Sequence, residues 1–257
     1  MKSKFIFITF IGASLFLNCR EKEKTDNLVQ EYYGNGQLEK SFTKKGTLII
    51  DTLKIFWPSG KLKEITVYDT NGIANGIHEL YDVSGKKILS TIYTNGVPIG
   101  YNFDFYPGGN LKGKGFHLDS LQVGNTYHYD ERGNVDTFLF FDFKSKILIE
   151  KQYSNDSLLR QRYTSYFIDT ILTSSDKNFI RIGVILARPP HESNNLFFYK
   201  IGDNGKIYDS IPYKSINEFD SIAIKLDYNL TMIKMKCIRY DSSNQQTTLE
   251  DGAIKIK

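Results

Sequence analysis

Five glycines follow one another at a nearly constant interval, and this interval constrains the fold more than any other feature of the chain. Steps of 24 or 25 residues separate Gly36, Gly60, Gly85, Gly109 and Gly133. Each glycine comes shortly after an aromatic residue; these are Tyr33, Trp57, Tyr81, Tyr106 and Tyr129. A fixed period of this size indicates a repeat array, in which each unit completes its core only against its neighbours.

Apolar and polar residues alternate before each of these turns. The predicted apolar faces are Leu53/Ile55/Trp57, Ile77/Glu79/Tyr81, Tyr101/Phe103/Phe105 and Asn125/Tyr127/Tyr129. A period of two with one apolar face is typical of a half-buried antiparallel strand. We therefore expect each unit to be a β-hairpin, and residues 32–162, with a worn sixth copy around Tyr153, to form one extended antiparallel sheet. The aromatic rings are interpreted as its packed face, and a platform for stacking a sugar or peptide is the alternative.

The period stops after about residue 162. Seven short strand-like runs, separated by polar turns, fill residues 163–257 and predict a β-sandwich. An immunoglobulin-like arrangement and another strand-rich topology both remain open. The candidate core faces are Ile182/Val184/Leu186 and Ile222/Ile224/Leu226. Because no run has a convincing helical period, the predicted fold class is all-β.

The first residues are typical of an export signal. Lys2 and Lys4 precede a stretch without charge at residues 5–17, which is shorter than the roughly 20 residues needed to span a membrane. The end of this segment, Phe16-Leu17-Asn18-Cys19, resembles a bacterial lipobox, although Phe16 and Asn18 depart from the usual pattern. Looser boxes of this kind are similar to those of Bacteroidota lipoproteins. An ordinary cleaved signal is the alternative.

The lipobox resemblance implies acylation of the Cys19 thiol, cleavage before it, and acylation of the new amine. It divides the chain into a signal peptide over residues 1–18, a charged tether with lipidated Cys19 over residues 19–31, the array and the C-terminal domain. The implied location is the cell envelope, with the outer membrane as the site of the anchor. Removal of Lys2 and Lys4 lowers the formal charge from +4 to +2, and no long basic block remains to bind nucleic acid.

The repeat unit resembles the MORN-repeat variant of bacteria, known as the YwqK-like antitoxin component family. Its best copy runs from Tyr93-Thr94-Asn95-Gly96 to Phe105-Tyr106-Pro107-Gly108-Gly109-Asn110-Leu111. The resemblance implies a function in protein contacts, and we expect the sheet to act as a non-catalytic binding or scaffolding module with a protein partner. The antitoxin name suggests an alternative, an immunity lipoprotein that neutralises a toxin delivered into the periplasm.

No constellation of catalytic or metal-ligating residues is apparent, so we expect neither an enzyme nor a cofactor or metal. The four histidines, which are His78, His117, His128 and His191, lack the spacing of a zinc site. Cys237 lies on one face of an alternating run with Met235, which is typical of a buried, inert thiol. Glu79 breaks an apolar face, and we expect it to reach the rim or to pair with a lysine from the adjacent hairpin; a buried acid with a shifted pKa is the alternative. A hydrolase with a site between the two domains is a further alternative, to be tested at Glu79 or His128.

Overall fold

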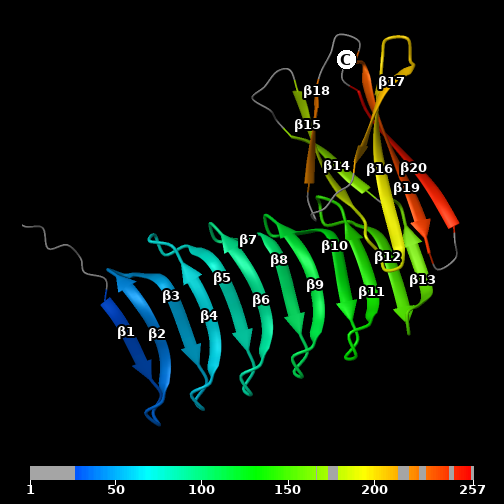
Figure 1. Ribbon diagram of the computed structural model, residues 1–257. Helices are drawn as coiled ribbons and strands as arrows, with labels where there is room; N and C mark the ends of the chain where they lie inside the picture. The colour runs from blue at the N-terminus through cyan, green and yellow to red at the C-terminus, as the bar shows by residue number, and fades with distance from the viewer. Residues whose placement is uncertain are drawn as a thin grey trace, which may run out of the picture.

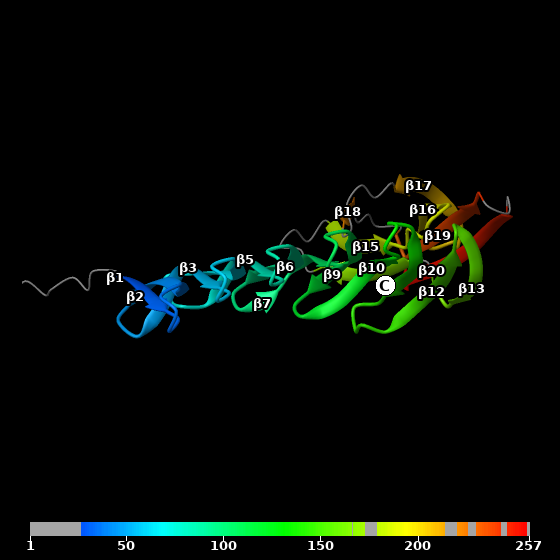
Figure 2. The same cartoon turned by 90° about the horizontal axis from the view of Figure 1, so that it is seen from below.

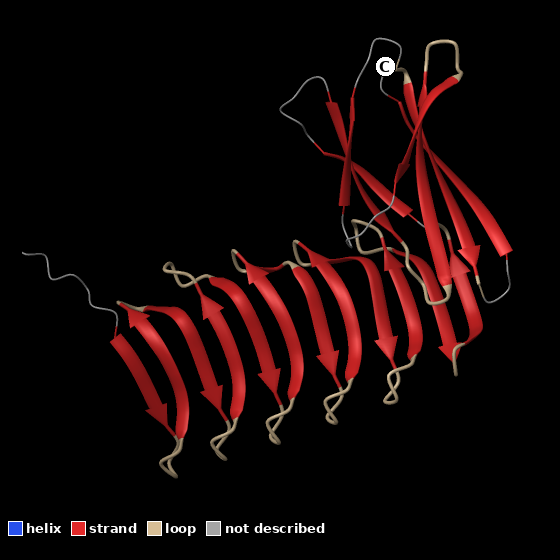
Figure 3. Ribbon diagram, viewed as in Figure 1, coloured by secondary structure: helices blue, strands red, loops and turns tan. Residues whose placement is uncertain are grey.

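The computed structural model describes residues 27–165, 167–172, 179–213, 220–225, 230–242 and 246–255. The predicted signal peptide, most of the predicted tether and Cys19 lie outside these residues. The elements of the described chain are all strands, which confirms the all-β fold class (Figure 3). No helix of the described residues is long and apolar enough to cross a membrane.

The first half of the chain is one antiparallel sheet of thirteen strands, laid side by side in sequence order (Figure 1). Its strands are β1 (Asn27–Tyr32), β2 (Leu38–Lys45), β3 (Leu48–Phe56), β4 (Leu62–Tyr68), β5 (Ala74–Tyr81), β6 (Lys87–Thr94), β7 (Val97–Pro98), β8 (Gly100–Phe105), β9 (Leu111–Leu118), β10 (Leu121–Tyr129), β11 (Val135–Phe141), β12 (Ile147–Ser154) and β13 (Ser157–Tyr163). The two-residue β7 pairs only with β6, off the main path. The sheet is a repeat array of hairpins, as the glycine interval predicts.

The ends of the array differ slightly from the prediction. The sheet begins at Asn27, inside the predicted tether, because Asn27–Tyr32 pairs in antiparallel register with β2. The worn sixth copy is the hairpin of β12 and β13, which ends at Tyr163. Its two-residue turn places Asn155 and Asp156 at positive φ, as a type I′ hairpin turn requires.

The C-terminal part forms two smaller antiparallel sheets. One has three strands in the order β14 (Phe167–Leu172), β15 (Phe179–Leu186) and β18 (Asp220–Lys225). The other has four strands in the order β17 (Ile207–Tyr213), β16 (Glu192–Ile201), β19 (Met232–Asp241) and β20 (Gln246–Lys255). Seven strands in two sheets agree with the predicted sandwich.

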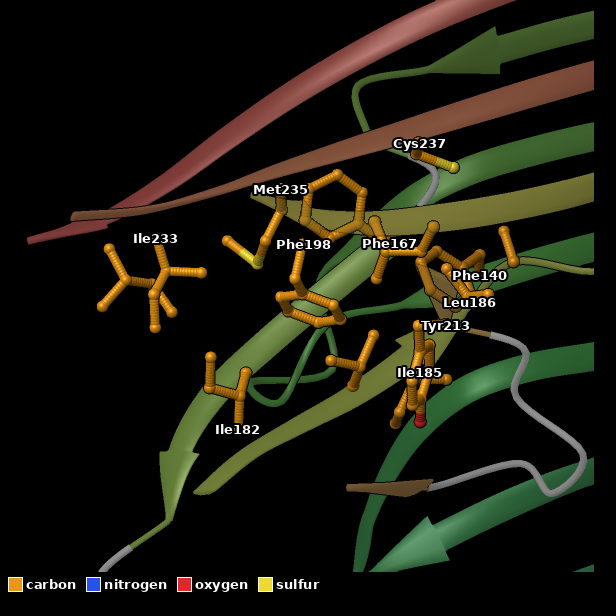
Figure 4. Close-up of a cluster of buried hydrophobic side chains, with 14 of the residues drawn as sticks. Phe140, Phe167, Ile182, Ile185, Leu186, Phe198, Tyr213, Ile233, Met235 and Cys237 are labelled. Carbon is orange, nitrogen blue, oxygen red and sulfur yellow. The ribbon is translucent and has the colours of Figure 1, made fainter. Parts of the chain in front are cut away.

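The main hydrophobic core lies between these two sheets and continues onto the end of the array. Ile182, Val184 and Leu186 are buried, as predicted, and so is Ile224; the side chains of Ile222 and Leu226 lie outside the described residues. Met235 and Cys237 face them from β19, which confirms that this thiol is buried. Phe140 of the array belongs to the same cluster (Figure 4).

Within the described residues, the two parts of the chain meet at one end of the array. Seen from below, the repeat sheet is one long, thin layer, and the smaller sheets gather beside its last strands (Figure 2). The array residues in the shared core come from β10, β11 and β12. Strands β1–β9 therefore extend beyond the main core as a sheet one layer thick.

Candidate functional site

Five turns along one edge of the array share one hydrogen-bond pattern. In each, the first residue donates its N–H to the carbonyl four residues later, and the glycine donates to the carbonyl of the first residue. The glycines, which are Gly36, Gly60, Gly85, Gly109 and Gly133, have φ between 80° and 92°. A left-handed residue closing a type I turn produces the bulge seen in each hairpin, and glycine adopts that conformation without steric cost.

The predicted aromatic residues of these turns fall into two sets. Tyr33, Trp57 and Tyr106 are the first residues of their turns, three positions before the glycine. Tyr81 and Tyr129 lie one residue earlier, as the last residues of β5 and β10, and aspartate occupies the first turn position behind them. In the sequence, all five share only their place shortly before a glycine. The structure separates the two sets because the positive φ of the glycine, rather than the aromatic, fixes the register of each unit.

The three turn aromatics bind each hairpin to the next. Tyr33 Oη donates to the Phe56 carbonyl at 2.7 Å, and Tyr106 Oη donates to the Tyr129 carbonyl at 2.7 Å. Trp57 Nε1 donates to the Tyr81 carbonyl at 3.2 Å. Each acceptor is the last residue of the strand that enters the next turn on this edge. Each of these three side chains therefore joins its own turn to the strand end that leads into the next turn on this edge.

Aspartates stabilise the turns that lack an aromatic. Asp82 accepts hydrogen bonds from the N–H groups of Ser84 and Lys86, and Asp130 accepts from those of Arg132 and Asn134. The hydroxyl of Ser84 and the N–H of Lys86 hold the pKa of Asp82 below its usual range. Two lysines then bind forward, since Lys61 Nζ donates to the Ser84 carbonyl and Lys86 Nζ donates to the Gly108 carbonyl.

Cross-strand pairing assigns every array residue to one of two faces. One face packs against the C-terminal part at its β10–β12 end, and we call it the docked face. It carries a row of paired residues that runs from β1 to β13: Gln30, Ser41, Lys54, Ile65, Glu79, Ser90, Phe103, Lys114, Tyr127, Phe138, Lys151 and Gln161. The open face carries the row Glu31, Lys40, Ile55, Glu64, Leu80, Leu89, Asp104, Gly113, His128, Thr137, Gln152 and Arg160.

This assignment corrects one of the predicted apolar faces. Ile55 pairs with Glu64, which pairs with Leu80, so Ile55 lies on the open face, whereas Glu79 lies on the docked face. The prediction placed Ile55 and Glu79 on the same face by counting back from Trp57 and Tyr81. The count failed because those two aromatics occupy different positions relative to their turns.

The docked face holds the C-terminal part through polar contacts around the aromatic residues. Asn125 is 1% exposed, donates Nδ2–H to the Leu186 carbonyl at 2.9 Å and accepts the Arg188 N–H at 2.7 Å. Tyr127 Oη donates to the Arg188 carbonyl at 2.7 Å. The array thus forms hydrogen bonds with the backbone at the end of β15 and just after it. The aromatic residues at this end of the docked face are packed, as predicted.

A buried ionic cluster adds to this junction. Lys151 Nζ pairs with Glu192 Oε1, and Arg239 Nη1 lies 3.4 Å from Glu192 Oε2. The three side chains are 0%, 3% and 7% exposed, so water does not screen them. Sequence reasoning missed this cluster. Its one signal is Lys151, which interrupts the alternation of Ile149 and Tyr153.

Glu79 is buried on the docked face, away from the C-terminal part. Burial would raise its pKa, but hydrogen bonds from Lys87 and Tyr81, both at 2.5 Å, outweigh burial and lower it. Burial and the bond to Glu79 raise the pKa of Tyr81 to about 12. The partner expected for Glu79, a lysine from the adjacent hairpin, is instead Lys87 of the same hairpin.

The open face carries polar groups around the middle of the array. Thr66 Oγ1 donates to Glu64 Oε1 and accepts from His78 Nδ1, both at 2.9 Å. Farther along, Asn102 Nδ2 donates to Asp104 Oδ2 at 3.2 Å. A row of small buried residues accompanies them on this face: Thr66, Thr91, Gly115 and Thr126.

Two glycines lie beneath these side chains: Gly113 has ordinary space for a Cβ, whereas Gly115 does not. A Cβ on Gly113 would lie 3.5 Å from Asp104 Oδ2 and 3.6 Å from His128 Nδ1. A Cβ on Gly115 would lie 3.0 Å from Gln122 Nε2, closer than real Cβ atoms normally come. The backbone at these two buried positions lies beneath a carboxylate, an imidazole and an amide, and we call it the glycine strip.

His117 is the one open-face residue of this strip with an orphan atom. Its Nδ1 is buried and has no hydrogen-bond partner within the described part of the chain. Burial lowers the pKa of its imidazole, although Asp104 opposes this effect. A buried polar atom without a partner costs about 1–3 kcal/mol.

The other residues singled out from the sequence do not converge on one centre. Glu79 and His128 lie on opposite faces of the sheet. The carboxylate at the junction, that of Glu192, already pairs with two cations. Among the described residues, no group of three or more His, Cys, Asp or Glu side chains is placed to hold a metal ion.

The fold and these surfaces define an all-β repeat protein, with a long hairpin array capped at one end by two small sheets. Comparisons with protein-family models and with curated proteins match no family and no relative.

Proposed function

We propose that this chain is a lipid-anchored protein of the cell envelope, held at the outer membrane by acylated Cys19, and that its repeat sheet binds a partner protein without catalysis. The observation that carries the proposal is that the C-terminal part covers only one face of the array, and only at one end, among the described residues. The C-terminal part packs on the docked face of β10–β12, while the open face carries hydrogen-bonding groups across β4–β10.

The chemistry of the open face suits a polar protein surface. It offers a carboxylate at Asp104, an imidazole at His128 and an amide at Asn102, with the glycine strip beneath them. Gly113 and Gly115 are buried beneath neighbouring side chains, so a partner would meet Asn102, Asp104 and His128, which are half-buried or exposed.

Fractionation of cells tests the anchor. Wild-type protein is expected in the membrane fraction, and the Cys19→Ala variant is expected in the soluble envelope fraction, because the acyl chains supply the membrane affinity. Cys237→Ala is the matched control, since it removes the buried thiol and leaves the anchor in place. Recovery of Cys19→Ala in the membrane would refute the anchor.

Capture of partners with the intact lipoprotein, followed by mass spectrometry, tests the binding surface. His128→Glu changes an exposed residue of the open face, and Ile92→Glu changes a residue that is 48% exposed on the docked face. We expect His128→Glu to lose the wild-type partner and Ile92→Glu to retain it. Loss of the partner with Ile92→Glu alone would assign binding to the other face.

A further inference from the structure

The outer edge of β1 ends the long sheet at its N-terminal side (Figure 1). Within the described residues, β1 pairs with β2 alone, so its other edge presents backbone N–H and C=O groups to pairing. Such an edge accepts another strand readily, and proteins usually block it with lysine, proline or a charged side chain pointing inward. Asn27–Tyr32 contains no lysine or proline.

Charge on β1 is low. Its one ionisable carboxylate, Glu31, already forms an ion pair with Lys40 at 3.2 Å. Two large apolar side chains are exposed instead, with Leu28 67% and Tyr32 57% accessible. Both lie on the docked face with Gln30, to which the Tyr32 hydroxyl donates at 3.0 Å.

The order of these residues is self-complementary. When two copies of β1 pair antiparallel with Gln30 opposite Gln30, Leu28 of each copy lies opposite Tyr32 of the other. The same register places Val29 opposite Glu31, on the open face. An aliphatic residue opposite an aromatic one is a favourable cross-strand pair, and two glutamine amides at the centre can bond to each other.

The other edge of the sheet, strand β13, is also unpaired on its outer side within the described residues, but its sequence disfavours pairing with a second copy. In β13, antiparallel pairing of two copies about the central Arg160 would place that arginine opposite itself, and pairing about Gln161 would place Arg160 opposite Arg162. Like charges directly opposite each other destabilise a strand pair. Arg160 and Arg162 thus protect one end of the array, whereas residues 27–32 of β1 contain no arginine or lysine.

We propose that two copies of this chain associate through β1, in antiparallel register about Gln30, so that their arrays join into one continuous sheet around a two-fold axis. The inference is independent of the anchor and of the array's partner. A symmetric pair closes on itself, which is the commonest form of protein assembly, whereas pairing of β1 with β13 would generate an open filament.

Molecular mass in solution tests the proposal. The full-length Cys19→Ala chain, purified in mild detergent, is expected to sediment as two copies, and Leu28→Lys is expected to weaken association about tenfold because two apolar pairs are lost. Leu159→Lys is the matched control: Leu159 is 68% exposed on β13, and its replacement is expected to leave the dimer intact. Circular dichroism checks that both variants keep the fold.

A thiol cross-link gives an independent reading in the same background, in which Cys237 is buried. Gln30→Cys is expected to cross-link with a short bis-maleimide, and Gln161→Cys is expected not to. The proposal is overturned if wild type is monomeric, if Leu28→Lys dimerises as tightly as wild type, or if Gln161→Cys alone cross-links. Growth into ever longer assemblies, abolished by Leu159→Lys, would instead establish head-to-tail pairing.

Discussion

The buried cluster of Lys151, Glu192 and Arg239 makes the strongest prediction about stability. Glu192→Gln keeps the shape of the side chain and leaves two cations facing each other out of water. Removing one member of a buried ion pair costs about 3–5 kcal/mol, because the remaining charge is not compensated. For a chain of this size, that corresponds to a fall in the melting temperature of roughly 10 °C.

Two further variants separate charge compensation from the loss of a contact. Lys151→Met keeps the apolar stem and leaves Glu192 with Arg239, so we expect a smaller cost of about 1–3 kcal/mol. Glu150→Gln is the matched surface control: its partner Arg162 is 65% exposed, and exposed pairs contribute about 1 kcal/mol or less. The expected order of destabilisation is Glu192→Gln, then Lys151→Met, then Glu150→Gln.

Urea unfolding followed by circular dichroism measures these free energies, with the midpoint and slope fitted separately for each variant. The variants that weaken the junction are also expected to release the C-terminal part to proteases before the array unfolds. The reasoning is refuted if Glu192→Gln is no more destabilising than Glu150→Gln, or if Lys151→Met is the more damaging of the two buried changes.

Three other predictions concern the turns. Gly85→Ala is expected to cost about 1 kcal/mol in urea unfolding because φ there is +86°, while Gly34→Ala, at a position with open space and no positive φ, should be nearly neutral. Tyr106→Phe removes only the hydroxyl that binds the Tyr129 carbonyl and is expected to cost about 1 kcal/mol, whereas Tyr32→Phe, whose hydroxyl is exposed, should unfold with wild type. The folded state lowers the pKa values of Asp69, Asp82 and Asp130 below the ordinary value of 3.8. The stability that these carboxylates contribute is therefore complete above pH 3.8 and is lost as the pH falls below it. Wild type should lose stability on acidification below about pH 4, and Asp82→Asn should lose less. Equal acid sensitivity in both proteins would contradict the last point.

Local regularity made much of this fold predictable. The glycine interval places the turns because positive φ is a property of single residues, and the alternation between turns places the strands. The seven C-terminal strands were found in the same way, although the last one, predicted over residues 253–257, begins earlier, at Gln246. The face of β3 was assigned wrongly because strand phase depends on the register of pairing, and one aromatic displaced by one residue reverses it.

The junction could not be predicted because it depends on residues far apart in sequence. Lys151 and Glu192 are separated by 41 residues and Asn125 and Leu186 by 61, and no local pattern records such contacts. A lysine at an apolar position was the one available signal, and it does not name its partner. The glycine strip of the open face could not be predicted either, because Gly113 and Gly115 stand out only once the structure places them beside Asp104 and Gln122.

The turn-to-turn hydrogen bonds also determine how the molecule would respond to mechanical load. Its strands run across the long axis of the array, and each hairpin is bonded chiefly to the next (Figure 1). A pull along that axis from the N-terminal end would therefore unzip the ladders one after another, starting at β1, instead of shearing them all at once. Each released unit of 24 residues would lengthen the chain by about 80 Å, so the array would extend in steps under tension while the capped end stays folded.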